Sequence, residues 1–123
     1  MATQIADLWG EFKPAVGRTP LAILREQAAL LGDKTKRLVE ARVVTRTDGS
    51  VFFHSFRLVV PALDLYTYEL FTVHHEVDLY PVTAYAETRL LKTEDEFVEW
   101  LRAKLSSEAT MRIIGNLMAQ AAG

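Results

Sequence analysis

An Asp48-Gly49 pair between two strand-like runs constrains the fold of this chain more than any other feature of its sequence. Aspartate followed by glycine is the strongest short signal for a β-hairpin, because a type I′ turn needs positive φ angles at both of its central positions. Before this pair, residues Leu38 to Thr47 alternate between apolar and polar side chains with the period of a strand. The sequence therefore predicts an antiparallel hairpin that turns at Asp48-Gly49.

The run after the turn, Val51 to Val60, is apolar on both of its faces. A strand of this kind is usually central in a sheet and covered on both sides. Pro61 ends the strand, because proline has no N–H to donate to a sheet. Two more strands are expected, from about Tyr66 to His75 and from about Pro81 to Thr88, which completes a four-stranded meander.

Four helices are expected around this sheet, and three of them have clear end signals. Thr19 is a good N-cap before Pro20, and Gly32 lies where a C′ glycine belongs. The run Thr93 to Glu96 is a capping box that opens a helix near the C-terminus. Ser106 or Ser107 caps a last helix, which runs to about Gln120.

The first helix is expected from Thr3 to Phe12. Its large apolar residues recur at offsets of zero, three, four and seven, which makes one stripe on a helix: Ile5, Leu8, Trp9 and Phe12. Lys13-Pro14 ends it, because the residue before a proline resists the α conformation. Trp9 and Phe12 are expected to dock on the core, and if exposed they would mark a partner site instead. The expected fold is α+β, one domain over residues 1–123, with an antiparallel four-stranded meander sheet, two N-terminal and two C-terminal helices.

Composition excludes several classes of protein. The sequence has no cysteine, which excludes disulfides, thiol catalysis and cysteine-ligated metal clusters. Its six glycines are isolated, so it has no phosphate-binding loop, and no cofactor is expected. A net charge of −2 argues against a nucleic-acid partner. No apolar run is long enough for a membrane span, and the lack of a secretory signal favours a cytoplasmic location.

A possible metal site includes the end of the third expected strand. His74, Glu76 and Asp78 share one face if that strand stays regular. A turn centred near residue 63 or 64 places His54 opposite Thr72 or His74. Two histidines with carboxylates suit zinc or non-haem iron. One hypothesis is thus a metal- or small-molecule-binding domain, with hydrolysis as one chemistry, and the other is a polar strand end that leads into a loop.

Two further sets of residues suggest contacts with other proteins. Tyrosine is enriched in interface cores. All four tyrosines lie within residues 61–100, where acidic side chains outnumber basic ones: Tyr66, Tyr68, Tyr80 and Tyr85. These tyrosines are also consistent with a half-buried sheet. The last expected helix is apolar over more than one stripe, through Met111, Ile113, Ile114, Leu117 and Met118. A twofold contact between two copies would cover these residues, and so would packing within one chain.

The leading expectation is a non-enzymatic protein-interaction or regulatory module. It depends on the absence of any catalytic motif, the tyrosines and the apolar last helix. The expected partners are another protein and a second copy of the chain, through the last helix. An enzyme centred on His54, His74, Glu76 and Asp78 is the alternative.

Overall fold

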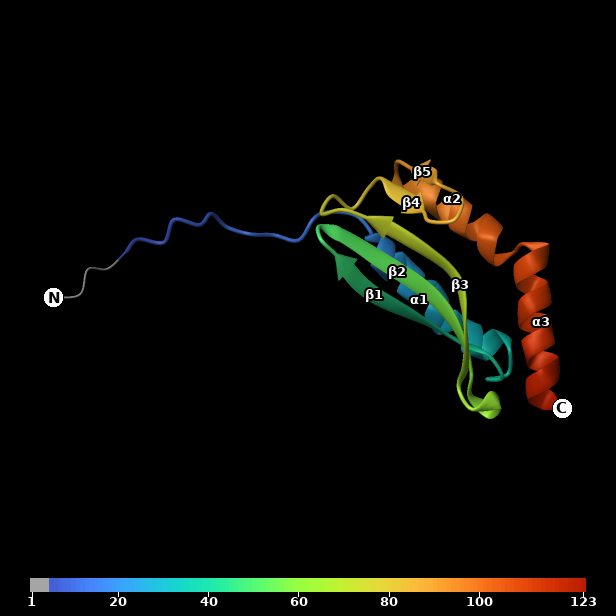
Figure 1. The fold of residues 1–123 in the computed structure, drawn as a ribbon. Helices are drawn as coiled ribbons and strands as arrows, with labels where there is room; N and C mark the ends of the chain where they lie inside the picture. The colour runs from blue at the N-terminus through green and yellow to red at the C-terminus, as the bar shows by residue number, and fades with distance from the viewer. Residues whose placement is uncertain (1–4) are drawn as a thin grey trace.

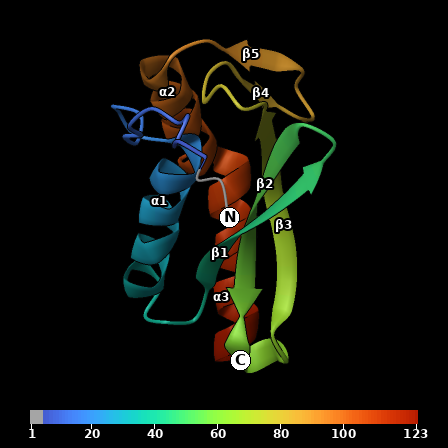
Figure 2. The ribbon, with the colours of Figure 1, turned by 90° about the vertical axis from the view of Figure 1, so that its left-hand side faces the viewer.

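The computed structural model describes residues 5–123 and shows an α+β fold with one antiparallel sheet. Within those residues the elements are α1 (Pro20–Lys34), β1 (Glu40–Asp48), β2 (Val51–Val60), the 3-10 helix η1 (Pro61–Leu63), β3 (Tyr66–His75), β4 (Val82–Ala84), β5 (Arg89–Leu91), α2 (Glu94–Leu105) and α3 (Glu108–Ala122) (Figure 1). The strands lie side by side in the order β1-β2-β3-β4-β5, which is a meander. All three of these α-helices lie on one side of the sheet (Figure 2).

The first hairpin forms where the sequence predicts it, but its loop is shifted by one residue. Asp48 pairs with Val51, so the loop consists of Gly49 and Ser50 rather than Asp48 and Gly49. Gly49 has a φ of +59°, and Ser50 is not among the residues with positive φ. A positive φ at the first central position alone is the pattern of a type II′ turn. The predicted type I′ turn is therefore wrong.

Strand β2 is central, as predicted, but helices cover only one of its faces. Phe56 and Leu58 point to the helix side and are buried. On the opposite face, Phe53 is half-buried, and the guanidinium of Arg46 lies 4.2 Å from the centre of its ring. A guanidinium over an aromatic face is attracted by the ring electrons and covers the apolar ring at the same time. Cross-strand neighbours, not a second layer of helices, thus shield the second apolar face.

Strand β3 contains one extra residue relative to β2. Phe56 pairs with Phe71 and Arg57 pairs with Glu69, which leaves Leu70 without an opposite residue. This is a β-bulge, and it changes the register of every pair on one side of it.

Of the fourth expected strand, Pro81 to Thr88, only Val82–Ala84 forms a strand, β4, and a fifth strand that was not expected, β5, follows. β4 ends at Ala84, and β5 begins at Arg89, after a turn. Thr88 has a φ of +51°, a conformation that β-branched residues rarely adopt. Since the turn contains no glycine or asparagine, the usual sequence signal for it is missing.

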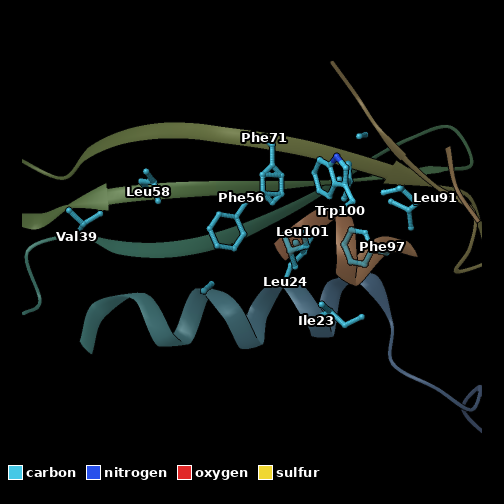
Figure 3. Close-up of a cluster of buried hydrophobic side chains, with 14 of the residues drawn as sticks. Ile23, Leu24, Val39, Phe56, Leu58, Phe71, Leu91, Phe97, Trp100 and Leu101 are labelled. Atoms are coloured by element: carbon cyan, nitrogen blue, oxygen red, sulfur yellow. The ribbon is translucent and has the colours of Figure 1, made fainter. Parts of the chain in front are cut away.

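The core lies between the covered face of the sheet and helices α1 and α2 (Figure 3). Leu24 of α1 and Leu58 of β2 have no exposed surface. Phe71 stacks on Phe56 with a centroid distance of 5.1 Å and meets Trp100 edge to face at 5.1 Å. Aromatic pairs in these geometries gain roughly 0.5–1.5 kcal/mol beyond the area that they bury.

The capping residues behave largely as predicted. Thr19 Oγ1 accepts a hydrogen bond from the Ala22 N–H, and Thr93 Oγ1 accepts one from the Glu96 N–H. Ser107 is the N-cap of α3. The predicted end of α1 at Gly32 is wrong, because the helix continues to Lys34 and Gly32 is buried inside it.

The N-terminal segment is the largest departure from expectation. No helix forms in residues 5–15, and Thr3, where the predicted helix begins, lies outside the described residues. Ile5, Leu8, Trp9 and Phe12 are each at least 75% exposed. A helix of about ten residues is marginal in water without a surface to pack on, and this segment runs away from the body of the fold (Figure 1).

Candidate functional site

An apolar cleft lies between α1, α2, α3 and the covered face of the sheet. Its volume is about 370 Å³. Leu30 and Leu31 come from α1, Leu58 from β2, and Leu70 from the bulge of β3. The remaining lining residues are Arg18, Ile23, Gln27, Lys34, Phe56, Val98, Leu101, Arg102, Leu105, Ser106, Thr110 and Ile114. A concave apolar site with a few polar groups at its margin is the usual form of a binding site.

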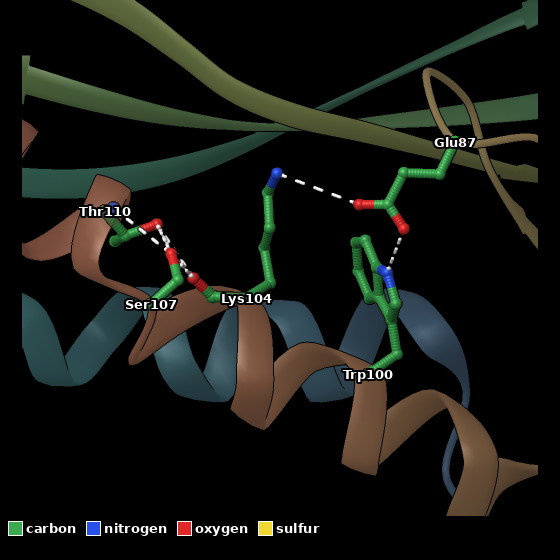
Figure 4. Close-up of polar contacts among 5 residues, drawn as sticks. All are labelled: Glu87, Trp100, Lys104, Ser107 and Thr110. Carbon is green, nitrogen blue, oxygen red and sulfur yellow. Dashed lines mark hydrogen bonds and ion pairs between the residues drawn. The ribbon is translucent and has the colours of Figure 1, made fainter.

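The sharp junction between α2 and α3 helps to form this cleft. Thr110 is buried, and its hydroxyl donates to the Lys104 carbonyl at 2.8 Å and accepts from the Ser107 hydroxyl at 3.1 Å (Figure 4). These bonds fix the first turn of α3. Beyond that turn, Leu117 is the one buried residue of α3. The helix therefore stands along the cleft rather than filling it.

Three basic side chains line the margin of the cleft. Arg18 pairs with Glu26, and Arg102 lies 3.5 Å from Glu99. Among residues 5–123, no carboxylate lies within 4.0 Å of the Lys34 ammonium. The cleft thus combines apolar walls with three basic side chains, of which Lys34 has no carboxylate partner in the described residues, and this suits an apolar ligand that also has negative charge.

A smaller hollow of about 170 Å³ lies between β3, the turn after β4 and α2. The Trp100 indole N–H donates to Glu87 at 3.0 Å, and the Lys104 ammonium lies 4.0 Å from the other oxygen of that carboxylate (Figure 4). Because these groups already bind one another, this hollow is the weaker candidate.

A buried pair of histidines lies on the covered face of the sheet. His54 Nε2 and His75 Nε2 are 2.8 Å apart, Thr45 Oγ1 lies 2.8 Å from His54 Nδ1, and His75 Nδ1 lies 2.6 Å from the Glu76 carbonyl oxygen. The carbonyl can only accept, so His75 donates through Nδ1 and, when neutral, accepts through Nε2. When both rings are neutral, His54 then donates through Nε2 and accepts from the Thr45 hydroxyl.

Burial lowers the pKa of His54 from 6.5 to about 4, and the positive charges of His75 and Arg25 add to this effect. A buried imidazole resists protonation because the charged form loses its hydration. Here an added proton would also force His54 into its other tautomer or place two N–H groups face to face. The pair therefore links β2 to β3 through a buried hydrogen bond, and burial favours the neutral form of His54.

The four predicted metal ligands do not come together. His54 pairs with Val73 and points toward the helices, whereas His74 pairs with Phe53 and points to the uncovered face. β3 ends at His75, so Glu76 and Asp78 lie in the loop beyond it, and both are exposed. In residues 5–123 no three histidine, aspartate or glutamate side chains are grouped as a metal site would need. The expected convergence of His54 with His74 is thus wrong.

The four tyrosines lie in separate places. Tyr66 and Tyr68 are exposed at the η1 end of β3. Tyr85 contacts the rings of Phe53 and His74, on the uncovered face. Tyr80 donates from its hydroxyl to the Arg18 carbonyl at 3.0 Å, and burial, aided by the charge of Glu94, raises its pKa to about 12. These residues do not form one continuous surface.

The apolar residues of α3 are divided between the core and solvent. Leu117 is buried, and Ile113, Ile114 and Met118 are partly buried against the core. Met111 is exposed. Ile114 also lines the cleft. The homodimer through these residues stays a prediction.

The cleft itself was not foreseen from the sequence. Its apolar lining residues come from five separate elements, and each is an ordinary apolar position within its own element. One local signal existed, because α1 has leucines outside its buried stripe, including Leu30, which is 50% exposed.

The chain matches no family model, no curated protein and no solved structure. No helix in residues 5–123 is both long and apolar enough to cross a membrane.

Proposed function

We propose that this chain is a non-enzymatic protein-interaction module that binds an apolar protein segment in the cleft between α1, α2 and α3. The observation that carries the proposal is the cleft itself, about 370 Å³ with mainly apolar walls. Exposed apolar surface of this kind on a folded domain commonly marks an interaction site. The proposal keeps the interaction function expected from the sequence and moves its surface from the tyrosines to the helical side.

The basic margin favours a partner segment with acidic residues. Arg18, just before α1, Lys34, at the end of α1, and Arg102 of α2 all line the cleft. Carboxylates that flank an apolar stripe would meet these cations where water still screens them, so they would add more to specificity and association rate than to affinity. An amphipathic helix laid in a groove is a common mode of such recognition.

Selection from a display library of random dodecapeptides tests this function. The target is the full chain with Trp9→Glu and Phe12→Glu. These changes remove exposed aromatic residues of the N-terminal segment, which could otherwise compete with a peptide for the cleft. We expect selected peptides with apolar residues at helical spacing and acidic flanks. Adding Leu30→Glu, which puts a carboxylate on the wall of the cleft, should weaken their binding at least tenfold.

The matched control is Val77→Glu, which adds the same charge at an exposed apolar residue away from the cleft. This control should leave peptide binding unchanged. Peptides that bind the Leu30→Glu protein equally well, or a selection that enriches nothing, would contradict the proposed function.

A further inference from the structure

The N-terminal segment presents an apolar stripe that its own chain leaves uncovered. Ile5, Leu8, Trp9 and Phe12 are exposed, and the rings of Trp9 and Phe12 contact each other at 5.6 Å. Their spacing is that of one helical face. Four large apolar residues on one short segment are far more than the scattered single exposures that are normal on a surface.

The cleft has the complementary properties. Its walls are apolar, and its margin carries Arg18, Lys34 and Arg102. The segment carries Asp7 and Glu11, four residues apart and therefore on one side of a helix, and Glu11 lies three residues from Leu8, beside the stripe. With the stripe in the cleft, the Glu11 carboxylate lies at the edge of the contact, where long basic side chains reach from the margin.

The path of the chain favours a cleft on another copy over the cleft of the same chain. The Arg18 N–H donates to Glu94 at 3.0 Å, and its carbonyl accepts from the Tyr80 hydroxyl at 3.0 Å. These two bonds hold the backbone where it enters α1. Gly17 has a φ of +105°, and the segment that precedes α1 runs away from the body (Figure 1).

We infer that residues 5–12 of one copy lie in the cleft of a second copy, and that the exchange is reciprocal. The inference rests on the proposed function, since it names the partner of the same site. Each aromatic side chain buries about 150–250 Å², and two reciprocal contacts bring the total into the range of roughly 1,200–2,000 Å² typical of specific interfaces. Exchange of an identical element between copies is a common route to a dimer. The segment gains its helix when it binds.

Complementation between two variants tests the exchange. One protein carries Trp9→Glu and Phe12→Glu and keeps an intact cleft. The other carries Leu30→Glu and keeps an intact segment. By analytical ultracentrifugation, we expect a dimer for the wild type and for the Val77→Glu control, and a monomer for each of the two variants alone. An equimolar mixture of the two variants should restore a dimer, joined by one segment in one cleft.

Three results would overturn the inference. A monomeric wild type at millimolar concentration would do so, and shielding of Trp9 from a soluble quencher in that monomer would show docking within one chain. A dimer that survives both variants would place the contact elsewhere, for example on α3. A mixture that stays monomeric at millimolar concentration would show that the segment does not enter the cleft. Any of these outcomes leaves the proposed function standing if the selected dodecapeptides still require the cleft.

Discussion

The Nε2 atoms of His54 and His75 lie 2.8 Å apart, so one hydrogen bond between two buried imidazoles joins β2 to β3. Burial holds the pKa of His54 well below its ordinary value. His54 therefore binds a proton less readily in the folded protein than in the unfolded chain, and this difference makes the free energy of unfolding depend on pH.

The free energy of unfolding should fall as the solution is acidified. The pKa of His54 is lowered from 6.5 to about 4 in the folded state. Its contribution is fully present above pH 6.5 and is lost as the pH falls from 6.5 toward 4, by up to about 3 kcal/mol. Urea unfolding at several pH values, for the wild type and a His54→Gln variant, measures this contribution. His74→Gln, on the opposite face, is the control, and equal pH dependence in all three proteins would contradict the prediction.

At alkaline pH, ionisation of Tyr80 should lower the free energy of unfolding. Its pKa is raised to about 12, mainly by burial and then by Glu94. The unfolded chain loses this proton near the ordinary value of 10, so the contribution is fully present below pH 10 and is lost as the pH rises from 10 to about 12. A Tyr80→Phe variant should lose this part of the alkaline destabilisation, and about 0.5–1.5 kcal/mol at neutral pH, because the bond to the Arg18 carbonyl is gone. Tyr85→Phe, at an exposed site, should change neither quantity.

Two glycine-to-alanine changes should have opposite signs. Gly49 has a φ of +59°, so Gly49→Ala should destabilise the hairpin by about 1 kcal/mol. Gly115 lies inside α3, and nothing would contact an added methyl group there within 4 Å. Gly115→Ala should therefore stabilise the protein by roughly 0.5–1 kcal/mol. Thermal unfolding of both variants decides this, and two changes of the same sign would show that one of these backbone assignments is wrong.

Truncation of Leu24 tests the packing of α1 on the sheet. The side chain is completely buried, so Leu24→Ala should cost about 2–5 kcal/mol. Leu65→Ala, at an exposed position, should stay within about 0.5 kcal/mol of the wild type. Denaturant unfolding measures both. A loss below 1 kcal/mol for Leu24→Ala would mean that α1 is not packed as described.

The strands and helix starts could be predicted because their signals are local. The bounds of β2 follow from the hairpin turn before it and from Pro61 after it. Thr19, Thr93 and Ser107 cap helices through their own side chains. The helix expected from residue 3 was wrong for a physical reason. Its stripe is real, but helix formation needs a surface to pack on, and a periodic pattern does not say whether that surface is present.

The histidine pair was missed by one residue. At the η1 end of the hairpin Val60 pairs with Tyr66, a register that would place His54 opposite Thr72. The bulge at Leu70 moves the partner of His54 to Val73 and brings His75 beside it. Neither of the two expected registers could include this shift, because no glycine or other signal marks the bulge. The cleft could not be predicted either, because it depends on the angle at which α3 leaves α2.

At position 70 the presence of a residue matters more than the identity of its side chain, because Leu70 is the extra residue of the bulge in β3. Before it, even-numbered residues of β3 such as Tyr68 face the helices, and after it, odd-numbered residues such as Phe71 do so. If Leu70 were deleted, one of two changes would follow. Either Tyr66 would no longer pair with Val60, or Phe71 and Val73 would point into water. Substituting another residue for Leu70 would cause neither change. We therefore expect natural variation at position 70 to accept many apolar residues and to reject a gap.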